Sequence, residues 1–229
     1  MKIRLLEDMK LEDITLIIKT IEVLDKHIKR INDNYKKISE YFYNTEEDYV
    51  GFEESSQDEV FSKTGRELTF EGSGIEAGAY SLSGCDFIIK VYKKSENDSL
   101  EKYMKLSEHT NVLVKTYGDF NTESAQYIIQ EKVKTFTSND VDLKENVFLD
   151  FYCELMKLSK YCDVLDVHYA NIGLDNSGAL KIIDWGAFDL TRTGEEMNDS
   201  TWFSILRFNH RRKVNIIKEM FTDEDTILQ

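Results

Sequence analysis

The residues best suited to chemistry lie in one short stretch of the chain, between Tyr161 and Phe188. A carboxylate, Asp166, is followed five residues later by an amide, Asn171. Two apolar segments joined by the turn sequence Asp-Asn-Ser-Gly then lead to Asp184, which begins the sequence Asp-Trp-Gly. Carboxylate and amide oxygens are hard ligands of the kind that Mg²⁺ takes, usually together with the phosphates of a substrate. The stretch therefore predicts a hairpin that presents oxygen ligands.

This spacing resembles the catalytic loop and the metal-binding motif of the protein-kinase-like superfamily. The resemblance implies phosphoryl transfer from ATP with Mg²⁺, because charge that spreads over the transferred phosphoryl oxygens has to be neutralised. It assigns Asp166 to orient the accepting hydroxyl and to take its proton. It assigns Asn171 and Asp184 to hold Mg²⁺. The competing interpretation is a β-hairpin whose acidic residues only cap turns.

The stretch departs from the pattern of full-length eukaryotic kinases before and after Asp166. Val164 and Leu165 stand where those kinases carry His and Arg. The arginine that reads a phosphorylated activation loop is thus missing, so control through that loop is not expected. His168 stands where protein Ser/Thr kinases usually carry Lys. At this position the segment is similar to aminoglycoside and choline phosphotransferases, and to the small early-expressed kinases of podovirus-type bacteriophages.

A glycine-rich segment comes earlier in the chain. Residues 68–80 predict a strand that runs into a glycine-rich turn, and residues 87–92 predict the strand after it. Gly72 and Gly74 would let backbone amides approach phosphates closely, although the sequence Gly-x-Gly also marks many ordinary hairpins. Lys90 stands where the resemblance places the phosphate-binding lysine of a kinase. The alternative for Lys90 is an ordinary lysine on an edge strand.

A helix is predicted after this strand, over residues 100–109, because Asp98 or Ser99 can cap it. Its expected inward side chains are Leu100, Tyr103, Met104 and Ser107. The resemblance requires a glutamate on this helix that orients Lys90. Glu101 is the preferred candidate and Glu108 the alternative, while a surface glutamate is the ordinary interpretation of both.

Two further strands are predicted over residues 112–117 and 127–130. Glu131, Lys132 and Val133 follow directly, and their place in the chain resembles the hinge whose backbone pairs with adenine. Glu131 and Val133 are accordingly expected to bind ATP through backbone groups.

The helix that leads into the catalytic stretch is predicted over residues 146–161. Its expected inward side chains are Phe148, Phe151, Tyr152, Leu155, Met156 and Leu158. After Gly186 only about forty residues remain, and residues 199–206 resemble the start of the buried helix that supports a kinase catalytic loop. A basic patch then follows, which is either a substrate-docking surface or a solvated helix face. It consists of Arg207, Arg211, Arg212 and Lys213.

A long amphipathic helix is predicted near the start of the chain, from Leu11 to about Phe42, because apolar residues recur there in alternating steps of four and three. They are Ile17, Ile21, Leu24, Ile28, Ile31, Tyr35, Ile38 and Phe42. This seam either packs on the chain's own globular part or binds a second copy or another partner. His27, beside the seam, is expected to be a solvated surface histidine. Residues 44–62 are acidic and without periodicity, which predicts a linker or a mobile surface loop.

The composition limits the possible partners. The chain has 229 residues and a formal net charge of −14, which argues against binding nucleic acid through its phosphates, because that binding depends on Lys and Arg. Its three cysteines, without a Cys-x-x-Cys pair, favour neither a disulfide framework nor a zinc site and suit a reducing cytoplasm. No apolar run is long enough to cross a membrane, and the first residues lack the apolar core of a signal peptide.

Together these features predict an α+β protein with a two-lobed protein-kinase-like fold, a truncated C-lobe and an added long N-terminal helix. The expected parts are 1–62, the helix and acidic linker; 63–133, the kinase N-lobe; and 134–229, the truncated C-lobe.

The resemblance to small kinases of phages and bacterial effectors implies Ser or Thr phosphorylation of host bacterial proteins, and of this protein itself. A small-molecule phosphotransferase of the aminoglycoside type is the runner-up, suggested by His168. A pseudokinase-like binding protein is the third possibility, and retention of all four positions of the expected site speaks against it.

Overall fold

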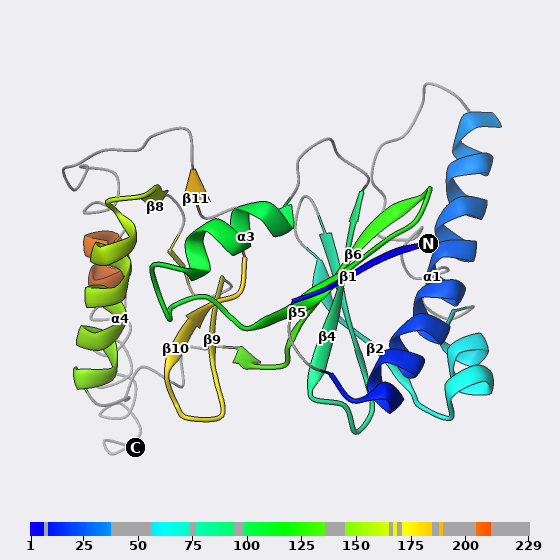
Figure 1. Ribbon diagram of the computed structural model, residues 1–229, viewed down its shortest axis with the longest axis horizontal. Helices are drawn as coiled ribbons and strands as arrows, with labels where there is room; N and C mark the ends of the chain where they lie inside the picture. Colours follow the sequence, from blue (N-terminus) through cyan, green and yellow to red (C-terminus); the bar gives the residue numbers. More distant parts are fainter. Residues whose placement is uncertain are drawn as a thin grey trace, which may run out of the picture. The chain divides into compact units, whose positions relative to one another are not determined.

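The computed structural model describes residues 1–6, 9–37, 56–73, 77–93, 99–135, 145–164, 167–168, 171–184, 188–189 and 205–211. The chain forms two compact units. The first comprises Met1–Leu100 and Lys115–Lys132, and the second comprises Glu101–Val114 and Val133–Gln229. The elements of both are drawn in Figure 1, and each unit is described by itself.

The described part of the first unit is built on a six-stranded antiparallel sheet with the strand order β1-β5-β6-β4-β3-β2. The strands are β1 (Lys2–Leu5), β2 (Leu68–Ser73), β3 (Ala77–Leu82), β4 (Phe87–Lys93), β5 (Thr116–Asn121) and β6 (Ala125–Glu131). With the helices described below, this sheet confirms the predicted α+β class.

The long helix α1 (Leu11–Lys37) covers one face of this sheet. Ile17, Ile21 and Leu24 are fully buried. They belong to one core with sheet residues such as Tyr80 and Ile89. The first half of the apolar seam therefore packs on the chain's own sheet, as the first of the two interpretations predicts. The second half, from Ile31 to Phe42, lies outside the described side chains.

The buried face of α1 is wider than a coiled-coil seam. Besides the three seam residues, Thr20, Val23 and His27 are buried. Apolar contacts at several steps around the helix are typical of a helix that packs on a globular core. The expectation that His27 is solvated is wrong for this reason: it lies on the widened face, and the residue is only 8% exposed.

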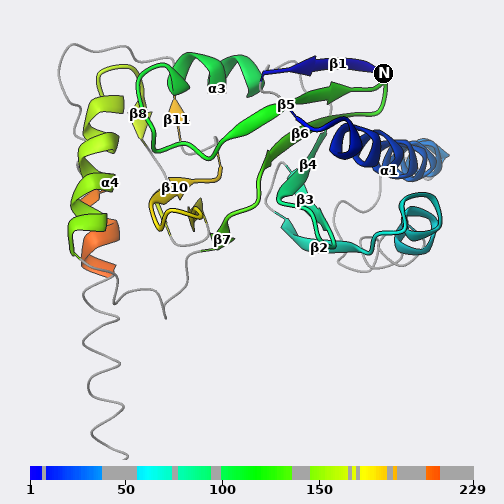
Figure 2. The same ribbon diagram turned by 60° about the horizontal axis from the view of Figure 1, so that its bottom comes forward.

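A second helix, over residues 56–64, lies on the same side of the sheet as α1 (Figure 2). The sequence predicts a linker here, but Val60 is fully buried in the shared core. Glu59 Oε2 lies 2.8 Å from Lys26 Nζ and 3.3 Å from His27 Nε2. The hydrogen bond from Lys26 lowers the pKa of Glu59. The basic part of α1 thus pairs with an acidic residue that the sequence alone places in a solvated segment.

The borders of the two units differ in part from the expected borders at 62/63 and 133/134. The position 62/63 lies inside the first unit, because α1 and the helix over residues 56–64 share a core with the sheet. Residues 101–114 of the expected part 63–133 belong to the second unit. The chain finally passes from the first unit to the second between Lys132 and Val133, next to the expected position 133/134. Residues 38–55, including most of the acidic segment, lie outside the described residues.

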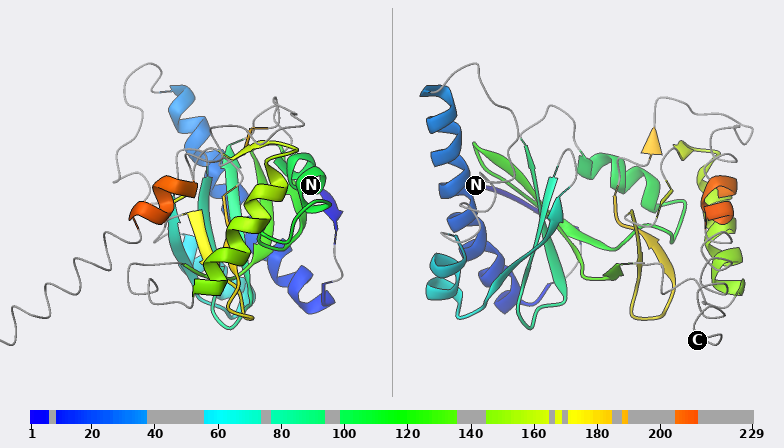
Figure 3. Two further views of the ribbon diagram at one scale, coloured as in Figure 1. Left: turned by 90° about the vertical axis from the view of Figure 1, so that its left-hand side faces the viewer. Right: turned by 180° about the vertical axis from the view of Figure 1, so that it is seen from behind.

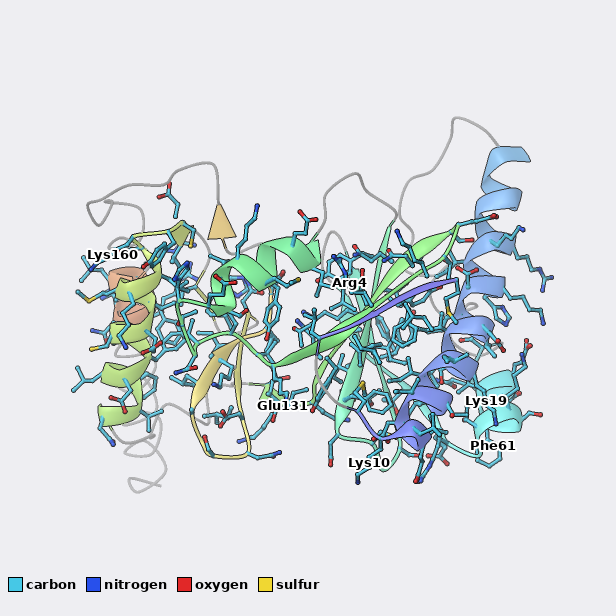
Figure 4. All side chains as sticks on the ribbon, in the orientation of Figure 1. Arg4, Lys10, Lys19, Phe61, Glu131 and Lys160 are labelled. Atoms are coloured by element: carbon cyan, nitrogen blue, oxygen red, sulfur yellow. The ribbon has the colours of Figure 1, made fainter. Side chains whose placement is uncertain are left out.

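The sequence analysis does not predict β1, which pairs with β5 at one edge of the sheet. Arg4, which is labelled in Figure 4, lies opposite Asp119. Its Nε is 3.2 Å from Asp119 Oδ1. The Asp119 carboxylate is completely buried and also accepts hydrogen bonds from the amide groups of Asn121 (2.6 Å) and Gln126 (3.2 Å). A buried carboxylate costs much less when it is paired and hydrogen-bonded. The amides of Asn121 and Gln126 help to satisfy Asp119, and its pair with Arg4 holds β1 on the sheet.

Gly118, opposite Leu5, allows this close pairing. Its φ is 153°, and an added Cβ would lie 2.3 Å from the carbonyl oxygen of Arg4. Gly118→Ala is expected to lower the free energy of unfolding by about 3 kcal/mol, since both backbone strain and the clash act against the substitution. Urea unfolding measures the loss. Gly65→Ala is the control, because Gly65 also has a positive φ of 68° but an added Cβ there would meet nothing within 4 Å. Equal losses in the two variants would contradict the close approach of β1.

The described part of the second unit contains short strands and helices. The strands are β7 (Lys134–Thr135), β8 (Asp163–Val164), β9 (Ile172–Leu174), β10 (Leu180–Ile182) and β11 (Phe188–Asp189), and the helices are α3 (Ser99–Ser107, of which the first two residues belong to the first unit), α4 (Glu145–Leu158) and 205–211. The strands form the sheets β10-β9-β7 and β11-β8. None of the described helices of either unit combines the length and apolar character needed to span a bilayer.

Helix α4 has the predicted inward face. Phe148, Phe151, Leu155 and Leu158 are buried, and Tyr152 and Met156 pack partly against the same core. The helix over residues 205–211 lies beside α4 (Figure 3). Its Phe208 ring is 6.2 Å from that of Phe151 and 6.5 Å from that of Phe148.

Two details of the second unit differ from expectation. Leu100 of α3 is buried and Tyr103 is partly buried, as predicted, but Met104 is 41% exposed and Leu106 is buried in its place. The predicted strand over residues 112–117 is divided: the backbone of Val112 and Val114 bonds to Ile182, and β5 begins only at Thr116.

Candidate functional site

The hairpin β9–β10 carries the residues that the sequence assigns to metal binding. Its strands pair with Ile172 opposite Ile182 and Leu174 opposite Leu180. Beyond the last pair, the N–H of Ile183 donates a hydrogen bond to the carbonyl oxygen of Asn171 over 2.9 Å. Asp184 is the next residue. The hairpin therefore brings Asn171 and Asp184 to the same open end, although twelve residues separate them in the sequence.

The groups at this open end have the chemistry that Mg²⁺ requires. Asn171 is 9% exposed and Asp184 is half-buried, and they offer one amide oxygen and one carboxylate. Among the described residues, no three His, Cys, Asp or Glu side chains are grouped so that they could hold a metal ion. Such a pair fits Mg²⁺ better than a metal that needs a complete protein cage, because Mg²⁺ keeps waters and takes further oxygens from phosphates.

The loop that precedes the hairpin is described only in part. The N–H of Asn171 donates to the carbonyl oxygen of His168 over 3.0 Å, which fixes the backbone of Asn171 against that histidine. Asp166, the expected general base, lies outside the described residues.

Neighbouring segments hold the hairpin on both sides. Strand β7 pairs with β9. On the other side, the N–H of Ile182 donates to the carbonyl oxygen of Val112 (2.7 Å), and the N–H of Val114 donates to that of Ile182 (3.0 Å). An added Cβ on Gly173 would lie 2.4 Å from Cγ2 of Val133. Sequence reasoning did not single out Gly173, although a glycine inside a predicted strand is itself a sign of close backbone approach.

The turn of the hairpin is organised by Asp175. Its Oδ1 accepts hydrogen bonds from the N–H of Ser177 (2.9 Å), the hydroxyl of Ser177 (2.6 Å) and the N–H of Ala179 (2.9 Å). Burial raises the pKa of Asp175, but these hydrogen bonds, with the nearby ammonium of Lys181, outweigh burial and hold the pKa below its usual range. The ionised carboxylate is thus the form that the folded turn prefers.

A pH-dependent stability is expected from this carboxylate. Because the pKa is lower in the folded than in the unfolded state, its contribution is complete above the unfolded value of about 3.9 and is lost as the pH falls through the folded pKa. Asp175→Asn should lower the free energy of unfolding by about 1–2 kcal/mol at pH 7, and the difference from the wild type should shrink below about pH 4. Urea unfolding at several pH values measures this, with the exposed Asp150→Asn as control. A constant difference down to pH 2.5 would contradict the assignment.

In the first unit, Lys90 lies on β4, which has β6 on one side and β3 on the other. Lys90 is therefore not on an edge strand, and that alternative is wrong. Ile89 is buried and Val91 is partly buried in the core under α1. Since successive side chains alternate between the faces of a sheet, the Lys90 side chain belongs to the face opposite α1.

The glycine-rich strand lies close to Lys90. Gly72 pairs with Ala79, and Ala79 pairs with Lys90, so the three residues form a row across β2, β3 and β4. Two strand spacings separate Gly72 from Lys90, which is roughly 10 Å. Gly72 follows an irregularity in the pairing of β2, has a φ of 145°, and an added Cβ would meet nothing within 4 Å. The backbone there is open to a close approach, while Gly74 lies outside the described residues.

The segment expected to bind adenine already uses two of its donors. The N–H of Glu131 donates to the carbonyl oxygen of Lys115, and the N–H of Lys132 to that of Asp86, each over 2.9 Å. Of the three expected residues, Val133 is therefore the one whose backbone N–H could donate to adenine.

A cluster of polar side chains joins the same segment to the strand that carries Gly72. Glu71 Oε1 accepts from the ammonium of Lys132 (2.8 Å) and from the hydroxyl of Ser81 (2.5 Å). The hydrogen bond from Lys132, followed by that from Ser81, holds the pKa of Glu71 below its usual range.

The remaining candidates are the glutamates of α3. Glu101 lies in the first turn of α3, and Glu108 follows its last residue. Both are exposed. They belong to the second unit and Lys90 to the first, so their pairing with Lys90 stays a prediction.

No protein-family model matches the sequence, and the search of curated proteins finds no match either.

Proposed function

We propose that the protein is a Mg²⁺-dependent kinase that transfers the γ-phosphate of ATP to Ser or Thr hydroxyls of proteins. The observation that carries the proposal is the β9–β10 hairpin, whose register places Asn171 and Asp184 at the same open end. The competing interpretation, a hairpin whose acidic residues only cap turns, explains Asp175. It does not explain an amide and a carboxylate at the opposite end. The row from Gly72 to Lys90 supports the proposal independently.

In this proposal each residue of the site has one task. Mg²⁺, when bound, neutralises charge on the phosphoryl oxygens. Asn171 and Asp184 hold it, and Lys90 contacts the phosphates while the backbone near Gly72 covers them. Asp166 accepts the proton of the attacking hydroxyl as the new O–P bond forms and the bond to ADP breaks. The proposal requires that the groups of both units act on one nucleotide.

The proposed substrates are proteins of a bacterial host cell and, in addition, the kinase itself. The proposed compartment is the cytoplasm. A small-molecule phosphotransferase is the second candidate, because the segment is similar to that class of enzyme at His168. The carbonyl oxygen of His168 accepts the hydrogen bond from the N–H of Asn171. Incubating the purified protein with labelled ATP, Mg²⁺ and a bacterial lysate tests the first candidate directly. The expected result is labelled phosphoserine or phosphothreonine on proteins. Neither should form when EDTA is present from the start to remove Mg²⁺. Turnover of amino-alcohols or sugars without any modified protein would favour the second candidate.

Asp166→Asn is expected to slow transfer by about 10² to 10⁴-fold, because general-base catalysis contributes about that much. Nucleotide affinity should stay close to that of the wild type, since the carboxylate acts on the accepting hydroxyl. Single-turnover kinetics and equilibrium binding of a fluorescent ATP analogue separate the two effects. If affinity and rate fell together, Asp166 would have a role in binding rather than in proton transfer.

A further inference from the structure

One segment has a charge opposite to that of the protein as a whole. From Thr201 to Lys218 the chain has no Asp or Glu, while the whole sequence contains 43 of them in 229 residues. The same 18 residues contain five Lys or Arg. This is the longest stretch without an acidic residue in the chain. In a protein with net charge −14, such a stretch is a local exception and a candidate surface for binding anionic groups.

The structure determines which side chains of the described part of this segment face solvent. In the helix over residues 205–211, Ile205 and Phe208 are buried in the core with α4. The Phe208 ring is anchored against α4 by three aromatic contacts, at 6.2 to 6.5 Å. Because these two side chains fix the rotation of the helix, Arg207 and Arg211 are left exposed on its other side.

The two arginines are placed to bind together. They are four residues apart, so they lie on the same face of the helix about 6 Å apart along its axis. Within the part of the chain that the structure describes, neither guanidinium has an ion pair. Leu206, which is 56% exposed, and exposed His210 lie beside them. Guanidinium groups bind carboxylates in a bidentate manner, so the surface offers two anion contacts with an apolar contact next to them.

We propose that this surface, Leu206, Arg207, His210 and Arg211, docks an acidic segment of a protein substrate. That the docked protein is a substrate rests on the proposed kinase function. The binding itself does not depend on phosphoryl transfer. Carboxylates of Asp or Glu would bind the arginines, and one apolar residue would cover Leu206.

The distribution of charge favours a short acidic segment over a nucleic acid or a lipid surface. The Debye length is about 8 Å at physiological salt. A short segment can therefore bind this patch without approaching the many carboxylates elsewhere on the protein. An extended polyanion or a membrane would also face those carboxylates and be repelled.

The test is direct binding without ATP. A short fluorescein-labelled peptide of Glu, Asp, Ser and one Leu is titrated with the protein, and anisotropy is recorded. Arg207→Glu with Arg211→Glu is expected to weaken binding by on the order of tenfold or more, since two exposed ion pairs become repulsive contacts. Lys10→Glu with Lys19→Glu is the matched control, because it makes the same charge change at exposed positions of the first unit (Figure 4). This control should reduce binding less than twofold.

Several results would overturn the proposal. Equal losses in the two double variants would show that only the total charge matters. Tighter binding of single-stranded RNA or of anionic phospholipid vesicles than of the peptide would assign the surface to another class of partner. Peptide binding that depends on the arginines, together with no transfer of labelled phosphate to any lysate protein, would support the docking surface and reject the kinase, so the two proposals fail separately.

Discussion

Asp184→Ala is expected to abolish phosphoryl transfer, reducing the rate by about 10³-fold or more, because the Mg²⁺ ion that neutralises the phosphoryl oxygens would lose its carboxylate ligand. The fold should survive, because Asp184 lies beyond the last residue pair of the β9–β10 hairpin and is only half-buried. Transfer of labelled phosphate to lysate proteins measures the rate, and thermal unfolding checks the fold.

The control for this experiment is Asp150→Ala, which removes a carboxylate from an exposed position of α4 and should leave transfer unchanged. Raising the Mg²⁺ concentration should restore part of the activity of Asp184→Ala, since Asn171 and the nucleotide phosphates still offer ligands. Transfer by Asp184→Ala at the wild-type rate would reject the site and with it the proposed function.

Leu24→Asp is expected to unfold the first unit in a large fraction of molecules. Leu24 is fully buried between α1 and the sheet. Truncating such a leucine costs about 2–5 kcal/mol, and a carboxylate in its place adds the cost of burying a charge. That sum is comparable with the whole stability of an ordinary domain, about 5–15 kcal/mol. Circular dichroism during urea unfolding measures the loss.

Leu11→Asp is the matched control, because Leu11 is in the same helix but 79% exposed, and an acidic residue in the first turn suits the helix dipole. It should change stability by less than about 0.5 kcal/mol. Light scattering gives a second readout. If Leu24→Asp only halved the molecular mass and left the fold intact, Leu24 would contact another copy and not the sheet of its own chain.

Elements with a strong local pattern could be predicted from the sequence. Helix α4 shows this, because every apolar residue expected on its inner side is buried or partly buried. The β9–β10 hairpin shows it as well, since the turn sequence from Asp175 to Gly178 specifies the reversal by hydrogen bonds within the turn. The approach of Asn171 to Asp184 follows from such a hairpin.

Elements stabilised by distant partners could not be predicted. Strand β1 has only four residues, and its Arg4 finds Asp119 far along the chain. The helix over residues 56–64 has the local sequence of a solvated acidic segment. Of the three described basic residues that contact Glu59, only Lys63 is local, while Lys26 and His27 lie on α1. His27 is likewise buried against a residue that is distant in the sequence, since it contacts Glu59. In each case the decisive interaction is with a residue that no local window contains.

The strand order of the first unit also constrains how the protein can be made. Strand β6, which lies between β5 and β4, ends at Glu131, and β1 has its partner only in β5. A ribosome adding roughly 5–20 residues per second therefore keeps the apolar face of α1 without its full sheet for on the order of 5–20 seconds. Pairing of such high contact order is slow, and nascent chains of this protein should depend on chaperones during that interval. Fragments that stop before β6 (Ala125–Glu131) should lack a stable sheet for the same reason.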